Sequence, residues 1–345
     1  MPSSGIKPTE PAPKGKFTHL LYENFYGLFP NKPKYLPEDY PDLTGKTAIV
    51  TGSNVGIGFY TMKLLYSKNC NVISVVRTQA KGEAAKESIL EEIKDSKGSI
   101  TVVGGCDLAD FETVKPAAKK IEEALGSNPL NIIIHNAGIA PAVNTQTSKL
   151  GYEMIFATNV MGPQLLQHFL DPLFLKEDDK LKRIVWLSSA IHYASSPEYG
   201  INWEDPLYEN SPVDKRPNAT TLYGNSKAAN AYQAKAWATR HKEIVDKIGC
   251  VSVSCFPGLL KSALTRDLSA FSNKVLSYLQ YDTIYGAYAE LYAALNPSFT
   301  IKDQGVYIVP FDEVHEPRAD IAAAMKNGTD LVLWDWIETK ISEFF

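Results

Sequence analysis

The 345-residue sequence has only four cysteines, and none of them forms a C-x-x-C pair. Disulfide frameworks and thiolate metal centres use cysteines at short, regular spacings, so the sequence argues against both. The six histidines show no ligand spacing either, and we expect no metal site. We interpret the cysteines as small buried residues of a protein in a reducing compartment. They are Cys70, Cys106, Cys250 and Cys255.

Long apolar runs and an excess of positive charge are also missing. No apolar run approaches the length that spans a bilayer. Residues 1–16 are rich in Pro, Lys and Ser and lack the apolar segment of a secretory signal, which predicts a disordered tail. Nucleic-acid binding usually requires a basic face, and the formal net charge here is −4. We therefore expect a cytoplasmic protein without a nucleic-acid partner, and leave association with a lipid-droplet or endoplasmic-reticulum surface open.

Several motifs of other enzyme classes are absent as well. The sequence contains no G-x-S-x-G elbow of a hydrolase, no complete P-loop and no H-E-x-x-H zinc helix. These absences leave few alternatives to the chemistry described below.

From about residue 44, short apolar runs rich in β-branched residues alternate with longer helical stretches. Continuous apolar strands fit a sheet that is covered on both faces, and helical crossovers fit parallel strands. We predict an α/β domain over residues 44–315 with a doubly wound, seven-stranded parallel sheet. An N-terminal helix and Pro-rich linker over 17–43 precede it, and a helical extension over 316–345 follows. The predicted strands are TAIVTG, NVISVV, SITVVGG, NIIIHNAG, RIVWLSS, VSVSCFPG and QGVYIVP.

A glycine-rich loop, TGSNVGIG, lies between the first strand and the following helix. Glycines there allow backbone N–H groups to approach a pyrophosphate at the helix N-terminus. An ordinary strand-to-helix turn is the alternative, but the position after the first strand favours a nucleotide. The second strand ends at Arg77, with no acidic residue beside it. An arginine there can accommodate the 2′-phosphate of NADP, so we predict NADP(H) rather than NAD(H).

The order of these and further motifs resembles the short-chain dehydrogenase/reductase family, in particular its retinol-dehydrogenase-like and fungal carbonyl-reductase-like branch. The resemblance runs from about Leu43 to Val309 and also includes CDLAD, HNAG, NVMG, LSSA, YGNSK and FPG. HNAG departs from the family's N-N-A-G only in its first residue. The resemblance implies a Rossmann fold, hydride transfer between NADP(H) and a carbonyl or alcohol, and a set of cofactor contacts. These are Gly52, Ser53, Asn54, Gly56, Ile57, Gly58, Arg77, Asp107, Leu108, Asn136, Ala137, Gly138, Tyr223, Lys227, Pro257 and Gly258.

Tyr223 and Lys227 are four residues apart and therefore neighbours on one helix face. Hydride transfer to a carbonyl leaves charge on oxygen, which a tyrosine hydroxyl can stabilise and protonate. A nearby ammonium lowers a tyrosine pKa toward the working pH. We choose Ser189 rather than Ser188 as the second oxyanion donor, on the family pattern. By resemblance, Asn159 holds a water in a relay to Lys227; hydrogen bonding within its own helix is the alternative.

Two loops are predicted to wall an apolar substrate. Residues 190–222 begin and end at catalytic positions and contain four aromatic residues, and residues 259–285 follow the P-G element. Candidate substrate contacts are His192, Tyr193, Leu259 and Leu260. The C-terminal segment is amphipathic, and we expect it to cover the domain, pair in a homodimer or touch a membrane.

Carbonyl reduction is the predicted activity, although the sequence does not encode direction. Oxidation of an alcohol, retinol-like or sterol substrate with NAD(P) is the first alternative. A catalytically idle NADP-sensing or scaffolding protein is the second, and the presence of all of the catalytic residue types argues against it.

Overall fold

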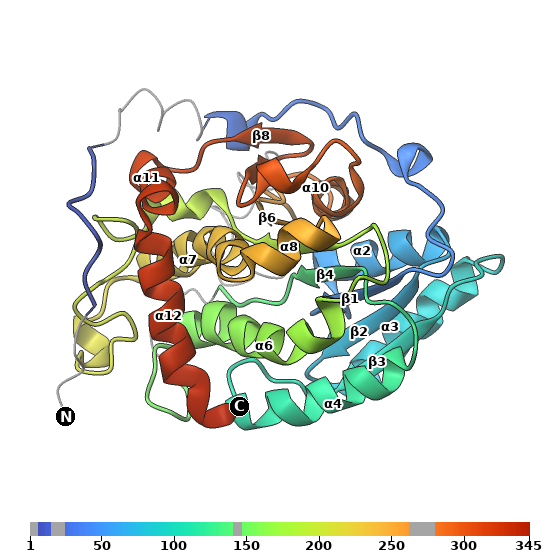
Figure 1. Ribbon diagram of the computed structural model, residues 1–345, viewed down its shortest axis with the longest axis horizontal. Coiled ribbons are helices and arrows are strands. Elements are labelled where there is room, and N and C mark those ends of the chain that lie inside the picture. Colours follow the sequence, from blue (N-terminus) through green and yellow to red (C-terminus); the bar gives the residue numbers. More distant parts are fainter. Residues whose placement is uncertain (1–5, 15–24, 141–146, 262–279) are drawn as a thin grey trace.

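The computed structural model describes residues 6–14, 25–140, 147–261 and 280–345. Its centre is an eight-stranded sheet with the order β3-β2-β1-β4-β5-β6-β7-β8 (Figure 1). All seven predicted strands are confirmed, and their pairings are parallel. They are β1 (Thr47–Thr51), β2 (Asn71–Val76), β3 (Ile100–Gly104), β4 (Ile132–His135), β5 (Arg183–Leu187), β6 (Val251–Cys255) and β7 (Tyr307–Val309).

The structure adds one strand that the sequence pattern did not predict. Strand β8, Glu313–His315, folds back antiparallel onto β7 and forms the edge of the sheet. It has only three residues and no buried side, so it carries neither an apolar run nor an alternating pattern.

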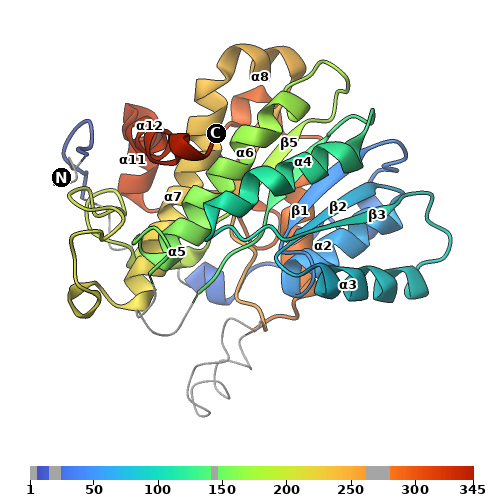
Figure 2. The ribbon, with the colours of Figure 1, turned by 90° about the horizontal axis from the view of Figure 1, so that it is seen from below.

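Helices cover both faces of the sheet (Figure 2). The described helices are α2 (Gly56–Ser67), α3 (Gln79–Glu92), α4 (Val114–Leu125), α5 (Met154–Phe156), α6 (Gly162–Phe174), α7 (Ala219–Arg240), α8 (Lys242–Ile248), α10 (Ile284–Leu295), α11 (Ala319–Asn327) and α12 (Thr329–Ile341). One apolar core lies between the sheet and α2, α3 and α10, and the other lies between the sheet and α4, α6, α7 and α12. The central strand β1 is buried along its whole length because it contributes to both cores.

The sequence pattern predicts one helix from about Tyr223 to Lys247, but α7 begins earlier, at Ala219, and ends earlier, at Arg240. The side chain of Asn218 accepts a hydrogen bond from the Thr221 N–H and caps the N-terminus, so Tyr223 lies in the second turn rather than the first. The predicted single helix to Lys247 is interrupted at His241, after which α8 begins.

The N-terminal segments are fixed by specific contacts. Residues 6–14 belong to the tail over 1–16 that was expected to be disordered, and the structure places them against the loop after β5 and the C-terminal extension. The Ile6 N–H donates to the Trp203 carbonyl, and Thr9 bonds with Thr329 at 2.7 Å. Nearer the domain, the Tyr26 hydroxyl donates to the Pro310 carbonyl. Of the predicted helix after residue 17, residues 17–24 lie outside the described part.

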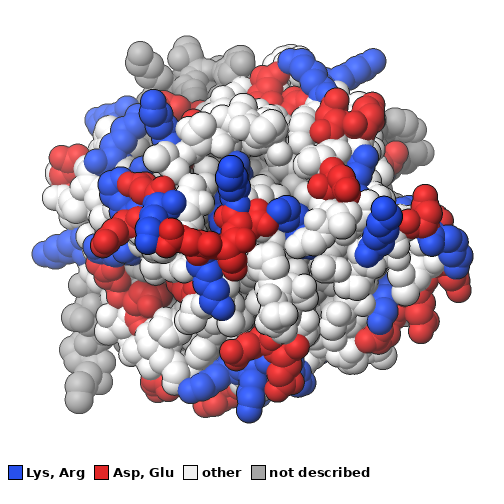
Figure 3. All heavy atoms as spheres, turned by 45° about the vertical axis from the view of Figure 1, so that its right-hand side comes forward, with Lys and Arg blue, Asp and Glu red and all other residues white. Residues whose placement is uncertain are grey.

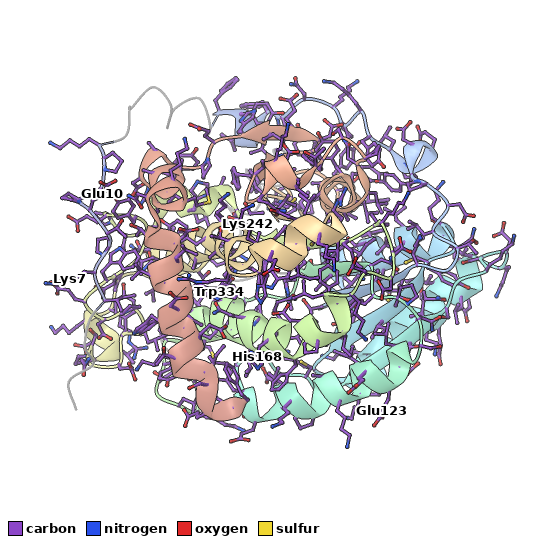
Figure 4. All side chains as sticks on the ribbon, in the orientation of Figure 1. Lys7, Glu10, Glu123, His168, Lys242 and Trp334 are labelled. Atoms are coloured by element: carbon purple, nitrogen blue, oxygen red, sulfur yellow. The ribbon has the colours of Figure 1, made fainter. Side chains whose placement is uncertain are left out.

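The C-terminal extension covers the domain, which was one of the three expected roles. Leu333, Trp334, Ile337 and Ile341 of α12 are buried against α6 and α7. The Trp334 ring points inward from α12 and meets Trp186 of β5 edge to face (Figure 4). Among the described residues, no helix is long and apolar enough to cross a membrane.

Candidate functional site

The glycine loop has the shape of a phosphate cradle at the carboxyl end of β1. Gly52 has a φ of +67° and lies against Ala137, so a side chain there would be strained. A Cβ on Gly58 would lie 2.4 Å from the Asn136 side chain and 2.8 Å from the Gly52 carbonyl, so only glycine fits. A Cβ on Gly56 would meet nothing within 4 Å, and the loop therefore has open space on its outer side. The loop backbone is thus packed tightly against the protein on its inner side and has free space on its outer side. Such a loop can hold a pyrophosphate.

Asn136 braces this loop from the neighbouring strand. Its Nδ2 atom donates to the Thr51 carbonyl at 2.7 Å and lies 3.3 Å from the Gly52 carbonyl. The Ala137 N–H donates to the Thr51 hydroxyl. The preceding His135 is buried, stacks on Trp186 and bonds to Gln167, and its burial lowers its pKa to about 4. Neutral histidine thus replaces the family's asparagine without adding a charge beside the loop.

The other predicted cofactor residues lie along the same edge, with different side-chain roles. Ser53 is fully buried and its hydroxyl bonds to Ser74, so only its backbone can face a ligand. Arg77 is exposed directly after β2. The Asp107 carboxylate accepts from the Ala109 N–H and is partly exposed after β3, whereas Leu108 is buried. The remaining predicted residues of the loop, Asn54 and Ile57, are partly exposed.

The two serines after β5 have separate functions. The Ser188 hydroxyl is buried and donates to the Lys227 carbonyl, so it fastens β5 to α7. Ser189 is partly exposed, and its Oγ atom accepts only a long, 3.3 Å bond from the Ile191 N–H. Ser189 is therefore the serine of the two whose hydroxyl can meet a reacting oxygen.

Tyr223 and Lys227 lie together on α7, with the Lys227 Nζ atom 5.5 Å from the centre of the tyrosine ring. The ammonium is buried and donates to the Leu187 carbonyl at 2.7 Å and to Asn230 Oδ1 at 3.1 Å. Burial raises the pKa of Tyr223 to about 12 and lowers the pKa of Lys227 to about 7. We expected the lysine to lower the tyrosine pKa, but here burial sets the direction of the shift and raises that pKa. In this state Tyr223 is therefore a protonated acid.

Asn159 is connected to Lys227 through a protein side chain. Its carboxamide is engaged, because Oδ1 accepts from the Ile139 N–H and Nδ2 donates to the Ile139 carbonyl. Its main-chain carbonyl accepts a 2.8 Å bond from Asn230 Nδ2, and Asn230 Oδ1 accepts from Lys227. Asn230 thus joins the Asn159 main chain to Lys227, and the relay water expected at Asn159 stays a prediction.

The predicted substrate loop over 190–222 points most of its aromatic residues inward. Tyr199, Trp203 and Tyr208 are buried, and the first two belong to the core under α7 and α12. His192 is completely buried, and both ring nitrogens bond to backbone atoms. Tyr193 is partly exposed. The geometry therefore leaves Tyr193 as a candidate for substrate contact and gives His192 a different environment from the one expected.

The segment after β6 begins at the carboxyl end of that strand, at the same edge of the sheet as the glycine loop. Pro257 is buried, and Gly258 has a φ of +104° and packs against Phe311. Leu259 is partly exposed, but Leu260 is buried in the core, where its side chain lies over Gly286 and Ile57. Most of the predicted lid, residues 262–279, lies outside the described residues.

Three contributors to the site were missed at the sequence level. Asn230 could have been found, because it follows Lys227 by three residues on the same helix face. The N-terminal Gly27 lies so close to Phe256 and Ala190 that an added Cβ would touch both, and Arg318 of the C-terminal extension bonds to the loop after Ser189. These two are distant in sequence from their partners and belong to no motif.

Comparisons with known proteins identify the family of the chain. The family model described as short chain dehydrogenase matches residues 46–200. The short-chain dehydrogenase/reductase bet4 of Neocamarosporium betae is 34% identical over an alignment of 337 positions that covers 92% of each chain. A short-chain dehydrogenase/reductase of Phomopsis amygdali is 33% identical over 92% of this chain and 96% of its own. The chain therefore belongs to the short-chain dehydrogenase/reductase family and is an oxidoreductase of that family.

Solved structures show the same fold. An uncharacterised protein from Mycobacterium paratuberculosis superposes with a TM-score of 0.67 and 25% identity, over 89% of this chain and 97% of its own. A short-chain type dehydrogenase/reductase from Mycobacterium marinum gives a TM-score of 0.59 at 21% identity, over 80% and 98% of the two chains.

Proposed function

We propose that the protein is an NADP(H)-dependent reductase of a mainly apolar carbonyl compound. The observation that carries the proposal is the meeting of three features at one sheet edge: the glycine cradle after β1, the accessible Ser189 hydroxyl after β5, and the Tyr223–Lys227 pair on α7. An idle nucleotide-binding protein would not need a buried lysine beside a tyrosine at this place. The reverse reaction, oxidation of an alcohol, would use the same residues.

In the proposed mechanism, Ser189 and Tyr223 hold the substrate carbonyl oxygen with two hydrogen bonds. A nicotinamide cofactor, when bound at the glycine loop, would supply the hydride for the carbonyl carbon. As negative charge develops on the oxygen, both hydroxyls stabilise it more strongly than they stabilise the uncharged carbonyl. Tyr223 then gives up its proton to the oxygen. Its raised pKa keeps that proton in place at neutral pH before the reaction, which suits a general acid in the reductive direction.

Lys227 has two tasks in this scheme. Its bonds to the Leu187 carbonyl and to Asn230 hold the ammonium below the tyrosine ring. There it stabilises the phenolate that remains after proton transfer, and it would hold the ribose hydroxyls of the cofactor. Since its pKa is lowered to about 7, Lys227 can also exchange protons near neutral pH and restore the proton of Tyr223.

The cofactor preference is proposed from Arg77. It is exposed immediately after β2, where the adenosine ribose of a dinucleotide lies in folds of this type. A guanidinium there can form a bidentate pair with a 2′-phosphate.

We predict that Arg77→Glu weakens NADPH binding by about 10- to 100-fold, because it replaces an attraction for the 2′-phosphate by a repulsion. Affinity for NADH should change by less than about threefold. Lys94→Glu is the matched control, since it makes the same change of charge in an exposed residue beyond the other end of α3. Titration calorimetry of the four combinations measures this, and equal losses for both cofactors would contradict the assignment.

A further inference from the structure

The loop that carries Ser189 is fastened to the C-terminal extension by an unusually dense set of bonds. His192 lies at its centre, three residues after the serine, and is completely buried. Its Nδ1 atom is 2.6 Å from the Ser189 carbonyl oxygen, and its Nε2 atom is 3.1 Å from the backbone nitrogen of Arg318. A backbone N–H can only donate, so Nε2 accepts and the ring proton lies on Nδ1. His192 therefore donates to the Ser189 carbonyl.

The Arg318 side chain holds the rest of the same loop. Its guanidinium donates to the carbonyls of His192, Ser195 and Ser196 at 3.3, 3.2 and 2.8 Å. It also forms a two-pronged ion pair with Asp320, at 2.7 and 2.8 Å. Asp320 in turn accepts a 2.7 Å bond from the Tyr199 N–H, so the pair spans the loop from His192 to Tyr199. The Arg318 side chain is only 17% exposed, so solvent does little to weaken these bonds.

This arrangement fixes the catalytic serine rather than the bulk of the fold. Ser189 has extended backbone angles and is the N-cap of the short 3₁₀ helix Ala190–Ala194. The direction of its hydroxyl depends on that backbone, and its carbonyl is held by both the ring and the N–H of His192. Misplacement of a reacting group by about 1 Å can cost about 100-fold in rate.

We propose that Arg318 and His192 are positioning residues for catalysis, through which the C-terminal extension sets the orientation of the Ser189 hydroxyl. The inference rests on the proposed function of Ser189. It adds that the active site is incomplete without residues 318–320, although they lie about 130 positions after the serine in the sequence.

The first test compares Arg318→Lys with Arg240→Lys in the full-length protein. Both substitutions keep a positive charge near an aspartate, but Arg240 pairs with Asp335 on the surface. Lysine lacks the planar fork that reaches several carbonyls. We expect Arg318→Lys to lower kcat by about 10- to 100-fold, while the affinity for NADPH stays unchanged. The kinetic isotope effect on kcat, measured with [4-²H]NADPH, should be larger than in the wild type. Arg240→Lys should match the wild type.

The second test compares two variants in which an amide side chain replaces His192, namely His192→Asn and His192→Gln. It remains informative if Arg318→Lys does not fold. In His192→Asn the amide replaces Nδ1 and can still donate to the Ser189 carbonyl, whereas in His192→Gln it replaces Nε2 and reaches only Arg318. We expect the asparagine variant to retain several-fold more kcat than the glutamine variant, at equal melting temperatures.

The outcomes separate the two proposals. Wild-type kcat in Arg318→Lys, or equal kcat in both His192 variants, overturns the positioning role and leaves the proposed function intact. A fall in kcat of the folded variants that merely follows a loss of NADPH binding also overturns it. Absence of turnover by the wild-type protein on carbonyls and alcohols overturns the proposed function and this inference together.

Discussion

At the scale of single residues, burial decides the protonation states in and near the site. Tyr223, Lys227 and His135 all have pKa values displaced toward their uncharged forms, because each lies where water is largely excluded. The same effect acts on Glu290 of α10, which is fully buried against α2. Its Oε2 atom accepts a 2.5 Å bond from the Thr61 hydroxyl, and burial raises its pKa to about 8.

We predict that Glu290→Gln stabilises the protein increasingly as pH rises from about 4.5 to about 8. Below pH 4.5 the glutamate is protonated in both the folded and the unfolded protein, so ionisation costs nothing. Between the two pKa values the unfolded chain ionises while the folded protein does not, and the wild-type free energy of unfolding falls with pH. Glutamine cannot ionise and avoids this loss. The gain at pH 8 should be of the order of a few kcal/mol.

Urea unfolding at several pH values measures the difference between the two proteins. Glu316→Gln is a suitable control, because Glu316 is exposed and pairs with Lys326 at the surface. A Glu290→Gln advantage that is constant with pH would contradict the buried-acid explanation.

The residue scale also shows which parts of the site the sequence could predict. The glycines, Ser189, Tyr223 and Lys227 belong to motifs with fixed local spacing, so their elements and neighbours followed from the pattern. His192 was expected to face substrate because it follows the serine closely, but burial cannot be inferred from position in an irregular loop. Its partner Arg318 is 126 positions away, and no local pattern connects the two.

At the scale of elements, the N-terminal segment lies beside the candidate site. Residues 25–28 form a helical turn beside the residue that follows β6. Tyr26 packs in a small cluster with Phe256, Tyr307 and Val309. A Cβ on Gly27 would lie 3.4 Å from the Phe256 ring and 3.9 Å from Ala190, which directly follows Ser189.

We therefore predict that Gly27→Leu changes substrate selectivity, whereas Gly27→Ala does not. Alanine fits at ordinary contact distance, but the larger side chain must displace Phe256 or Ala190. KM for a bulky apolar ketone should rise several-fold relative to KM for a short-chain ketone. Asn31→Ala, which removes only the surface bond to Glu313, provides the control. An equal change for both ketones would contradict a role in selectivity.

Strands could be predicted from the sequence where a recognisable apolar pattern was present. The seven longer strands have apolar, β-branched runs that can be recognised in the sequence. Strand β8 has three residues and an exposed centre, Val314, so its pairing with β7 depends on the chain reversing at the sheet edge. The aromatic residues of the 190–222 loop were expected at a substrate surface, yet Tyr199 and Trp203 are buried, because the N-terminal and C-terminal segments pack over that loop.

At the scale of the whole molecule, both chain ends complete the domain. Residues 6–14 bond to the loop after β5 and to α11 and α12, and α12 closes the core outside α6 and α7 (Figure 1). On the face shown in Figure 3, acidic and basic side chains are intermixed rather than separated into large patches of one sign. The amphipathic C-terminal pattern correctly predicted a buried face, but it could not show which surface that face would meet.

Two tryptophans on α12 test how much this covering helix contributes. Trp334 is 6% exposed in the core, whereas Trp336 lies partly exposed beside Lys340. Trp334→Ala should lower the free energy of unfolding by about 3–5 kcal/mol, the usual cost of removing a large core side chain. Trp336→Ala should cost about 1 kcal/mol. Equal effects in denaturant unfolding would contradict the observed packing.

The central claim is that Tyr223 protonates a carbonyl oxygen during reduction with NADPH. The most direct measurement is the oxidation of NADPH by the wild-type protein and by Tyr223→Phe, over a panel of aldehydes and ketones, with NADPH affinity measured in parallel. The account predicts that the variant binds NADPH as the wild type does and loses about 100- to 10,000-fold in kcat. A Tyr223→Phe protein that turns over as fast as the wild type would contradict it.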